Sequence, residues 1–305
     1  MLQALINALA LGSAYALLAL GFVLIVNATR AVNFAQGDMV MAGGYVAVAL
    51  AAVLPVPGVA LLPGVIVLMI VLGLVFSLFA YFPLKSRPPV SVFISTIALG
   101  IIFQNTANVV FGGAPRGAPP LFSGGLLTVG GVSLSEQSAA VIVVAALLIA
   151  GQWWLFARTA LGRQLRATAQ DRQMAEAIGV RVNGMIAFTF GLAAALAGAA
   201  GLLLANTFFV SPTDGTNYII KAYIAVTIGG WGSLPGAVAG ALLIALFEVL
   251  YPLLPTLLPL LDRWIPATDT LFSQTMATIL LYIAVLLILF FRPQGLFGEV
   301  VQRRA

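Results

Sequence analysis

The sequence predicts an all-α integral membrane protein, a polytopic bundle of about eight or nine transmembrane helices. Three observations predict it. The 305-residue chain is 62% hydrophobic and only 8% charged, whereas soluble proteins carry about 25% charged residues. Apolar runs of about 20 residues, long enough to cross a bilayer, recur along the whole chain. One long polar stretch, residues 158–183, interrupts them and is expected to face the cytoplasm.

The expected membrane spans follow the apolar runs. A shorter apolar piece at 218–229 is too short for an ordinary span, so we expect a tilted or broken helix that protein or water covers. No linker or low-complexity tract marks a second domain, and residues 1–305 are expected to form a single transmembrane domain. The other expected spans are 5–26, 35–54, 62–82, 90–111, 139–157, 184–206, 236–255 and 271–291.

The Lys and Arg residues set the expected orientation, because cytoplasmic loops are enriched in them. With the 158–183 loop in the cytoplasm, alternation of the spans puts eleven of the fourteen basic residues on that side. This count requires the 218–229 piece to cross the membrane. A re-entrant piece would break the alternation on one flank, so we expect the crossing, with the N-terminus outside and the C-terminus inside.

The residue inventory excludes several classes of function. The chain has no cysteine and no histidine, which removes disulfides, thiolate chemistry, His-based metal sites and His proton relays. The nine acidic residues are scattered, so no metal site and no cofactor is expected. There is no GxxxxGK[ST] phosphate loop. We therefore expect a protein that is not an enzyme and does not hydrolyse ATP by itself. The net charge of +5 is attributed to loops facing anionic lipid and not to nucleic-acid binding.

The loop at 158–183 is expected to hold a short amphipathic helix. Thr168 and Asp171 have the spacing of a capping box, and Gly179 is a natural C-terminal stop. The helix between them would be about two and a half turns long, which is marginal in isolation. It therefore needs a surface to pack on, either lipid headgroups or a groove in a cytoplasmic partner.

The two faces of this helix differ in character. Met174, Ala177 and Ile178 fall on one apolar face. Arg172 and Glu176 are four residues apart and are expected on another face, where they can pair.

The start of the second span carries Asn33, Gln36 and Asp38. Asn33 and Gln36 have capping-box spacing, and Asp38 lies in the first turn, where the helix dipole favours an anion. Two interpretations stay open. These residues either cap a helix at the membrane surface or gate the cytoplasmic mouth of a path.

Polar side chains also occur inside the apolar spans. Gln104, Asn105 and Asn108 are expected on one face of the fourth span, where amides either join helices or line a path. Glu248 is the one acidic residue well inside an apolar span, and such residues need a partner. We expect that partner to be Lys221 near the outer side, in a pair that is either structural or part of an outer gate.

Four separated strings resemble the branched-chain amino-acid permease family of ABC importers. The resemblance covers nearly the whole chain and is to the shorter of the two permeases that such systems use. The strings are NFAQGDMVMAGGYVA at 33–47, LGRQLRATAQDRQMAEAIGV at 161–180, KAYIAVTIGGWGSLPGAVAGALLIALFEVL at 221–250 and RPQGLFG at 292–298.

The resemblance implies a set of partners. It implies a second permease subunit in a heterodimer, two cytoplasmic ATPase subunits and an extracytoplasmic solute-binding protein, all at a bacterial cytoplasmic (inner) membrane. Glu176-Ala177 followed by Gly179 is similar to the coupling-loop motif of such permeases, so the ATPases would dock on this loop. The implied coupling residues are Thr168, Asp171, Arg172, Met174, Glu176, Ala177, Ile178 and Gly179.

The resemblance also implies a function: uptake of branched-chain or related hydrophobic amino acids. The same architecture carrying urea, short amides or another small polar solute stays open, because the binding protein would set most of the specificity. A secondary transporter would need intramembrane ligands for a coupling ion, and Glu248 is the single candidate. The residues expected along the path or its gates are Asn33, Gln36, Asp38, Gln104, Asn105, Asn108, Lys221 and Glu248.

Overall fold

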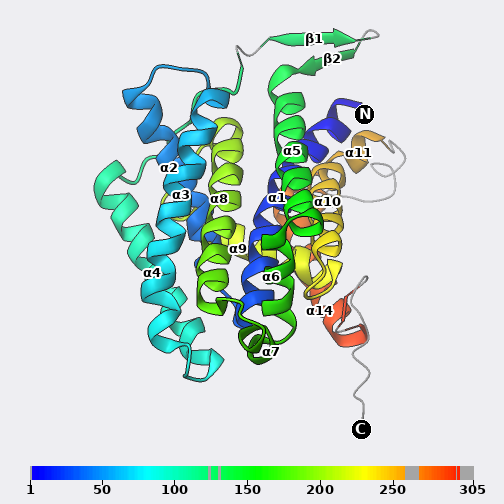
Figure 1. Ribbon diagram of the computed structural model, residues 1–305. Helices are drawn as coiled ribbons and strands as arrows, with labels where there is room; N and C mark the ends of the chain where they lie inside the picture. Colours follow the sequence, from blue (N-terminus) through cyan, green and yellow to red (C-terminus); the bar gives the residue numbers. More distant parts are fainter. Residues whose placement is uncertain (1, 123–124, 130–131, 258–267, 293, 296–305) are drawn as a thin grey trace.

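The structure is a computed structural model that describes residues 2–122, 125–129, 132–257, 268–292 and 294–295. Long helices form a bundle, and a short antiparallel hairpin of β1 (Leu126–Val129) and β2 (Val132–Ser135) lies across one end of it (Figure 1). The helices of the bundle are α1 (Leu2–Thr29), α2 (Gln36–Val53), α3 (Gly58–Ala80), α4 (Pro89–Phe111), α5 (Glu136–Arg158), α8 (Val182–Phe208), α9 (Asp214–Gly229), α10 (Leu234–Leu250) and α14 (Gln274–Phe291).

Shorter elements connect these helices. The 3-10 turn η1 (Phe82–Leu84) joins α3 to α4, and α6 (Ala160–Gln170) and α7 (Arg172–Ala177) join α5 to α8. Beyond α10 follow η2 (Tyr251–Leu253), α11 (Leu254–Leu257) and α13 (Thr268–Leu271). In the described part of the chain, eight helices are long and apolar enough to cross a membrane. They match the eight long spans expected from the sequence, so the all-α polytopic fold is confirmed.

Helices α1 and α8 form the core of the bundle. In each, 83% of the most apolar stretch is buried, whereas the buried share is 17–28% for α3, α4, α5 and α14. The core helices are rich in Gly and Ala, which lets neighbouring backbones approach closely in a membrane. A Cβ atom at Gly43 of α2 would overlap the backbone of Gly198 of α8, and one at Gly201 would overlap the carbonyl of Val40.

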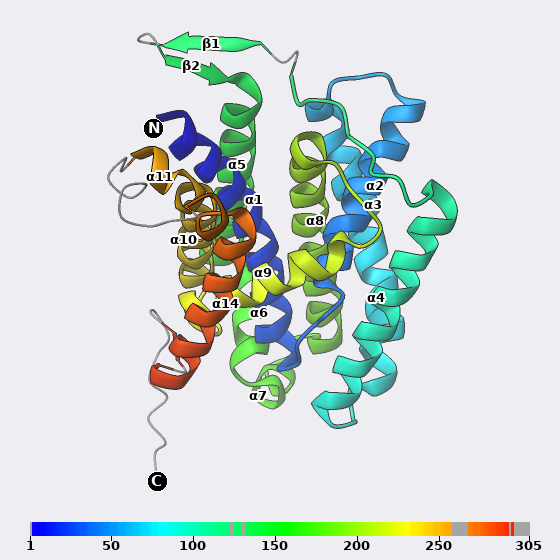
Figure 2. The ribbon, with the colours of Figure 1, turned by 180° about the vertical axis from the view of Figure 1, so that it is seen from behind.

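Helices α2 and α9 both begin inside the bundle. Each follows a core helix whose end is marked by a residue in the left-handed region, Arg30 (φ 58°) after α1 and Phe209 (φ 62°) after α8. The first turns of α2 and α9 touch, since a Cβ atom at Gly37 would overlap the carbonyl of Gly215. Because α1 and α8 run in opposite directions (Figure 2), the α1–α2 and α8–α9 segments repeat one arrangement in inverted orientation.

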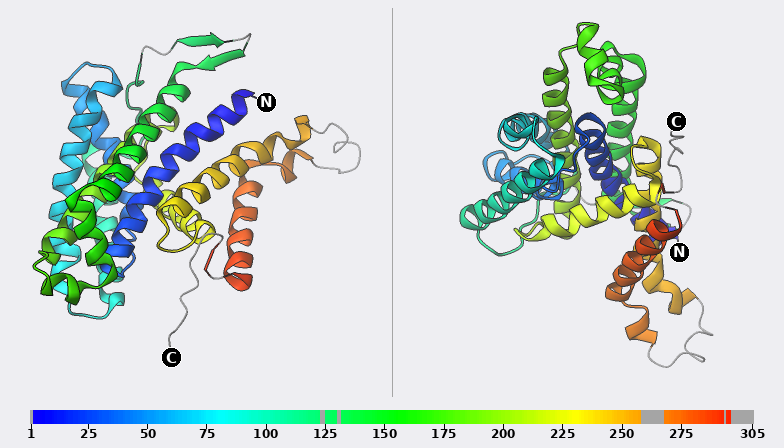
Figure 3. Two further views of the ribbon diagram at one scale, coloured as in Figure 1. Left: turned by 45° about the vertical axis from the view of Figure 1, so that its right-hand side comes forward. Right: turned by 90° about the horizontal axis from the view of Figure 1, so that it is seen from below.

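The chain crosses the bundle between α8 and α10, as the count of basic residues requires. The connection descends from the end of α8 on the hairpin side, and α9 then lies across the bundle (Figure 2; Figure 3, right). The turn after α9 lies beside the opposite end of α1, where the Asn27 amide donates a hydrogen bond of 3.0 Å to the carbonyl of Gly232. The helix begins at Asp214, four residues before the apolar piece expected at 218–229.

A labelling experiment tests the orientation of this bundle. The chain has no cysteine, so single cysteines at Ile178, just beyond α7, and at Phe122, in the segment leading to β1, report on opposite ends. Both native side chains are exposed. An impermeant thiol reagent added to intact cells should label Phe122→Cys, and Ile178→Cys only after permeabilisation. Labelling of Ile178→Cys in intact cells would overturn the orientation.

Candidate functional site

The polar loop folds as two short helices at the end of the bundle opposite the hairpin (Figure 1). Thr159 caps α6 by accepting a hydrogen bond from the Gly162 amide (3.0 Å). Asp171 caps α7, because its carboxylate accepts from the Met174 amide (3.0 Å). The expected capping box that starts at Thr168 is therefore wrong. Thr168 is buried within α6, where its hydroxyl bonds back to the carbonyl of Gln164, because the helix started at Thr159 continues past it.

Two arginines fasten this loop to the membrane helices. Arg172 donates to the Tyr81 hydroxyl (3.0 Å) and to the carbonyl of Ala28 at the end of α1 (2.7 Å). Arg30, just after α1, donates to the carbonyl of Ala169 (2.8 Å). Arg172 thus faces the bundle, and its expected pairing with Glu176 on a free face is wrong. Its guanidinium instead satisfies a backbone carbonyl exposed where α1 ends.

The opposite side of α7 is open. The side chains of Met174 and Ile178 are 62% and 70% exposed, and Glu176 and Ala177 are exposed between them. Gly179 ends the helix with φ 86°, as expected, and its amide donates to the carbonyl of Glu176. We call the exposed side formed by Met174, Glu176, Ala177 and Ile178 the α7 knob. It presents apolar surface beside a carboxylate.

The polar residues at the start of α2 lie inside the bundle and not at its surface. Asn33, Gln36 and Asp38 are all buried. The Gln36 amide donates to the carbonyl of Ala193 in α8 (3.2 Å), and Asn33 donates to Gln36 (3.3 Å). The helix starts after Ala35 without a side-chain cap. Surface capping by Asn33 is therefore wrong, because these amides pair with backbone and side chains in the core instead.

The three amides of α4 do not share one environment. Gln104 donates to the Asp38 carboxylate (2.8 Å), which links α4 to α2. That carboxylate also lies against Gly100 of α4 and Gly215 of α9, where a Cβ atom would overlap it. Asn105 and Asn108 are exposed on the outside of α4, and the Asn105 amide bonds back to its own helix.

Lys221 and Glu248 form the expected ion pair. Tyr15 of α1 completes the cluster: its hydroxyl accepts from Lys221 (2.7 Å) and donates to Glu248 (3.2 Å). The position differs from the expectation. Lys221 lies halfway along α9, and Tyr15 lies at the middle of α1. The pair is therefore deep in the bundle and not near the outer side.

Tyr15 was missed from the sequence because it lies far from both partners along the chain. The signal that could have found it is a lone tyrosine at the centre of a long apolar helix. A hydroxyl at that depth needs a polar partner, and a buried ion pair is one. Tyr81 was missed for a similar reason, since it bonds a residue of a distant loop.

Long apolar helices around a buried polar cluster, with the anchored α7 knob at one end, define a multi-pass membrane protein. Residues 4–290 match the family model described as the branched-chain amino acid transport system / permease component. The chain belongs to this family.

Relatives of known function agree. The chain is 30% identical over 98% of its length to the high-affinity branched-chain amino acid transport permease BraD of Pseudomonas aeruginosa, covering 96% of that protein. It is 31% identical to LivH of Escherichia coli K12, a permease of the same description, over 82% of this chain and 85% of that one. A shorter match, 37% identical over 33% of this chain and 30% of the relative, is to the autoinducer 2 import permease LsrC of Escherichia coli O9:H4 (strain HS).

A double-mutant cycle tests the buried pair. Glu248→Gln and Lys221→Met should each destabilise the protein by about 3 kcal/mol, because each strands a buried charge. The double change should recover part of that loss, which the midpoint of thermal unfolding in detergent would show. Tyr15→Phe, the matched control, keeps the ion pair and should cost only about 1 kcal/mol. If the double change destabilises the protein by the sum of the two single changes, Lys221 and Glu248 do not pair directly.

Proposed function

We propose that this chain is the permease subunit of an ABC importer that takes up branched-chain amino acids across a bacterial inner membrane. The observation that carries the proposal is the α7 knob. Its exposed apolar side chains flank a carboxylate, while Arg172 holds its other side against α1. Because this surface is exposed, a partner protein can bind it, and because it is hydrogen-bonded to α1, movement of the partner can be transmitted to the membrane helices. The family membership and the relatives BraD and LivH support the substrate class.

In this proposal, separate ATPase subunits bind the α7 knob from the cytoplasm. The chain itself is non-catalytic, and no phosphate loop occurs in its sequence. Movement of α7 reaches α1 through Arg172 and Arg30, which bond α7 and α6 to the two sides of the α1 terminus. Since α1 also carries Tyr15, the same helix connects the knob to the buried Lys221–Glu248 pair.

The assembly would hold a second permease subunit, two ATPases and an extracytoplasmic solute-binding protein. Within it, Lys221 and Glu248 are proposed as a gate halfway along the bundle, since their pairing joins α9 to α10 at that level. Asn105 and Asn108 are proposed to face the path or the second permease, because exposed amides are costly against lipid. We propose that Asn33, Gln36 and Asp38 hold the start of α2 against its neighbours, because Gln36 bonds α8 and Asp38 accepts from α4.

A second substrate class follows from one observation. The partial match to LsrC, an autoinducer 2 import permease, shows that related sequence serves a solute other than an amino acid. Uptake into proteoliposomes containing the whole complex distinguishes the alternatives. Labelled leucine supplied with the binding protein should accumulate in an ATP-dependent manner, whereas autoinducer 2 and urea should not. Accumulation of either of these solutes without leucine would replace the substrate class and leave the permease role intact.

Charge reversal on the knob tests the motor contact. Glu176→Arg should lower ATP-driven uptake by about tenfold, because a reversed charge at an interface costs on the order of 1 kcal/mol or more. The melting temperature should hardly change, since Glu176 is exposed. Arg87→Glu reverses an exposed charge in the turn before α4 and should keep normal uptake. Equal uptake by Glu176→Arg and the unmodified complex would remove Glu176 from the motor contact.

A further inference from the structure

A continuous groove runs between α5 and α10 with α1 as its floor. Its inner part has a volume of about 690 Å³ and is lined by apolar side chains such as Leu20, Ile149, Val238 and Leu242. Its outer part, of about 680 Å³, opens at the end of the bundle that carries α6. The two parts share Trp153, Phe156, Leu234 and Pro235. Volumes of this size are typical of ligand sites.

The groove follows from how α1 packs. Helices α5 and α10 both pack on α1 and lie on either side of it (Figure 3, left). Near the inner end, Gly12 of α1 lets α10 pack closely, since a Cβ atom there would press against Leu242 and Ala245. At the outer end, Ser233 caps the first turn of α10 by accepting from the Gly236 amide (3.1 Å).

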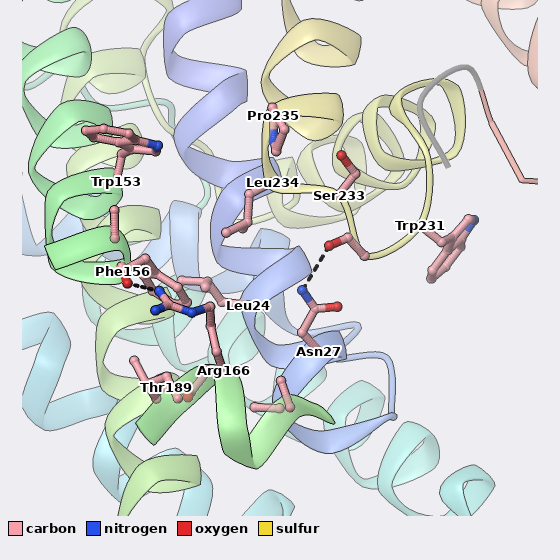
Figure 4. Close-up of a pocket in the computed structure, with 15 residues that line it drawn as sticks. Leu24, Asn27, Trp153, Phe156, Arg166, Thr189, Trp231, Ser233, Leu234 and Pro235 are labelled. Atoms are coloured by element: carbon pink, nitrogen blue, oxygen red, sulfur yellow. Dashed lines mark hydrogen bonds between the residues drawn. The ribbon is translucent and has the colours of Figure 1, made fainter. Parts of the chain in front are cut away.

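The polarity of the groove changes along its length. Figure 4 shows Arg166, Asn27 and Ser233 around the outer part, with Trp153 on α5 above Arg166 and Asn27. Arg166 is exposed, and its guanidinium donates to the carbonyl of Phe156. Trp153 is 67% exposed, and tryptophans gather at the level of lipid headgroups. The inner part is almost entirely apolar. From the end that carries α6 toward the middle of the bundle, the groove thus presents first a cation, then an aromatic ring and then hydrocarbon.

Gln152 is the exception within the inner part. Its residue is 6% exposed, and its side-chain oxygen has no hydrogen-bond partner among the residues that the structure describes. A buried amide without a partner costs free energy comparable to a lost hydrogen bond. It lines the groove at the depth of Trp153, its neighbour in sequence. Because this oxygen accepts hydrogen bonds, a ligand would have to bring a donor to this depth to pair it.

We propose that this groove binds one anionic glycerophospholipid of the cytoplasmic leaflet. The phosphate lies against Arg166 and the positive end of the α10 dipole. An acyl chain fills the apolar part between Ile149 and Val238. The stretch from Ala146 to Ala157 of α5 is about 17 Å long at 1.5 Å per residue, which is half of a bilayer core.

Charge and depth favour a lipid over a protein as the occupant. Arg158, at the end of α5, and Arg163, in the same helix as Arg166, are also exposed. Juxtamembrane arginines attract anionic lipids of the cytoplasmic surface, by about 1 kcal/mol each. Because the site requires none of the α7 knob residues, it stands or falls independently of the transport function.

Native mass spectrometry of the purified full chain tests the site. With equal amounts of phosphatidylglycerol and phosphatidylcholine added, the chain should retain one phosphatidylglycerol in preference. Arg166→Ala should lower that retention about tenfold, since a charge-assisted hydrogen bond to phosphate is lost. Arg163→Ala removes an exposed arginine of the same helix that does not line the groove, so it should lower retention clearly less than Arg166→Ala does. Equal retention of the two lipids, or equal loss in both variants, would overturn the proposal.

A photo-crosslinking amino acid in place of Ala150 gives a second readout in native membranes without altering Arg166. Ala150 lines the inner part and is exposed to it. Irradiation should add the mass of a phospholipid to the chain. A covalent link to another polypeptide would mean that the groove is a contact between subunits. If no phospholipid adduct forms, the groove does not hold a phospholipid. Either result contradicts the proposal.

Discussion

The structure depends on one constraint: backbone polar groups inside a bilayer must find partners within the protein. The chain stops two core helices and restarts two shorter ones inside the bundle, at Gln36 and Asp214. These breaks are possible because they are buried against each other. Gly37 and Gly215 bring the two first turns into contact. Around them, Gln36 bonds α8 and Asp38 accepts from Gln104 of α4.

The same need for partners explains two contacts of α1, one at its end and one at its middle. Its final carbonyls would be unpaired at the end beside α6 and α7, and Arg172 from the polar loop satisfies the carbonyl of Ala28. Halfway along, Tyr15 bonds the Lys221–Glu248 pair. A single buried helix therefore contacts both the surface proposed for the ATPases and the deepest charges of the bundle. This arrangement gives the proposed coupling a physical route through direct hydrogen bonds.

The sequence predicted the long helices well, because hydrophobic length alone determines a membrane span. It also predicted the Lys221–Glu248 pair, since each charge needs a partner at that depth. Cap positions were predicted less well. Thr168 and Asn33 each have capping-box spacing, yet the helix before Thr168 continues and Asn33 lies in the core. Local spacing cannot reveal which tertiary partner a polar side chain finds.

Other features could not be predicted because they join residues far apart in the chain. Arg172 meets Tyr81 and Ala28, and neither contact leaves a mark in the loop's own pattern. The groove between α5 and α10 depends on the angle between two helices, which hydropathy does not encode. Gln152 offered one clue, as a lone amide beside two tryptophans.

The central claim is that an ATPase subunit binds the α7 knob, and crosslinking from position 178 tests it most directly. A thiol–amine crosslinker applied to native membranes containing Ile178→Cys would capture the nearest protein. The account predicts a product that joins this chain to a polypeptide with a GxxxxGK[ST] phosphate loop. If position 178 reacts fully with a small maleimide but yields no product with such an ATPase, the account is contradicted.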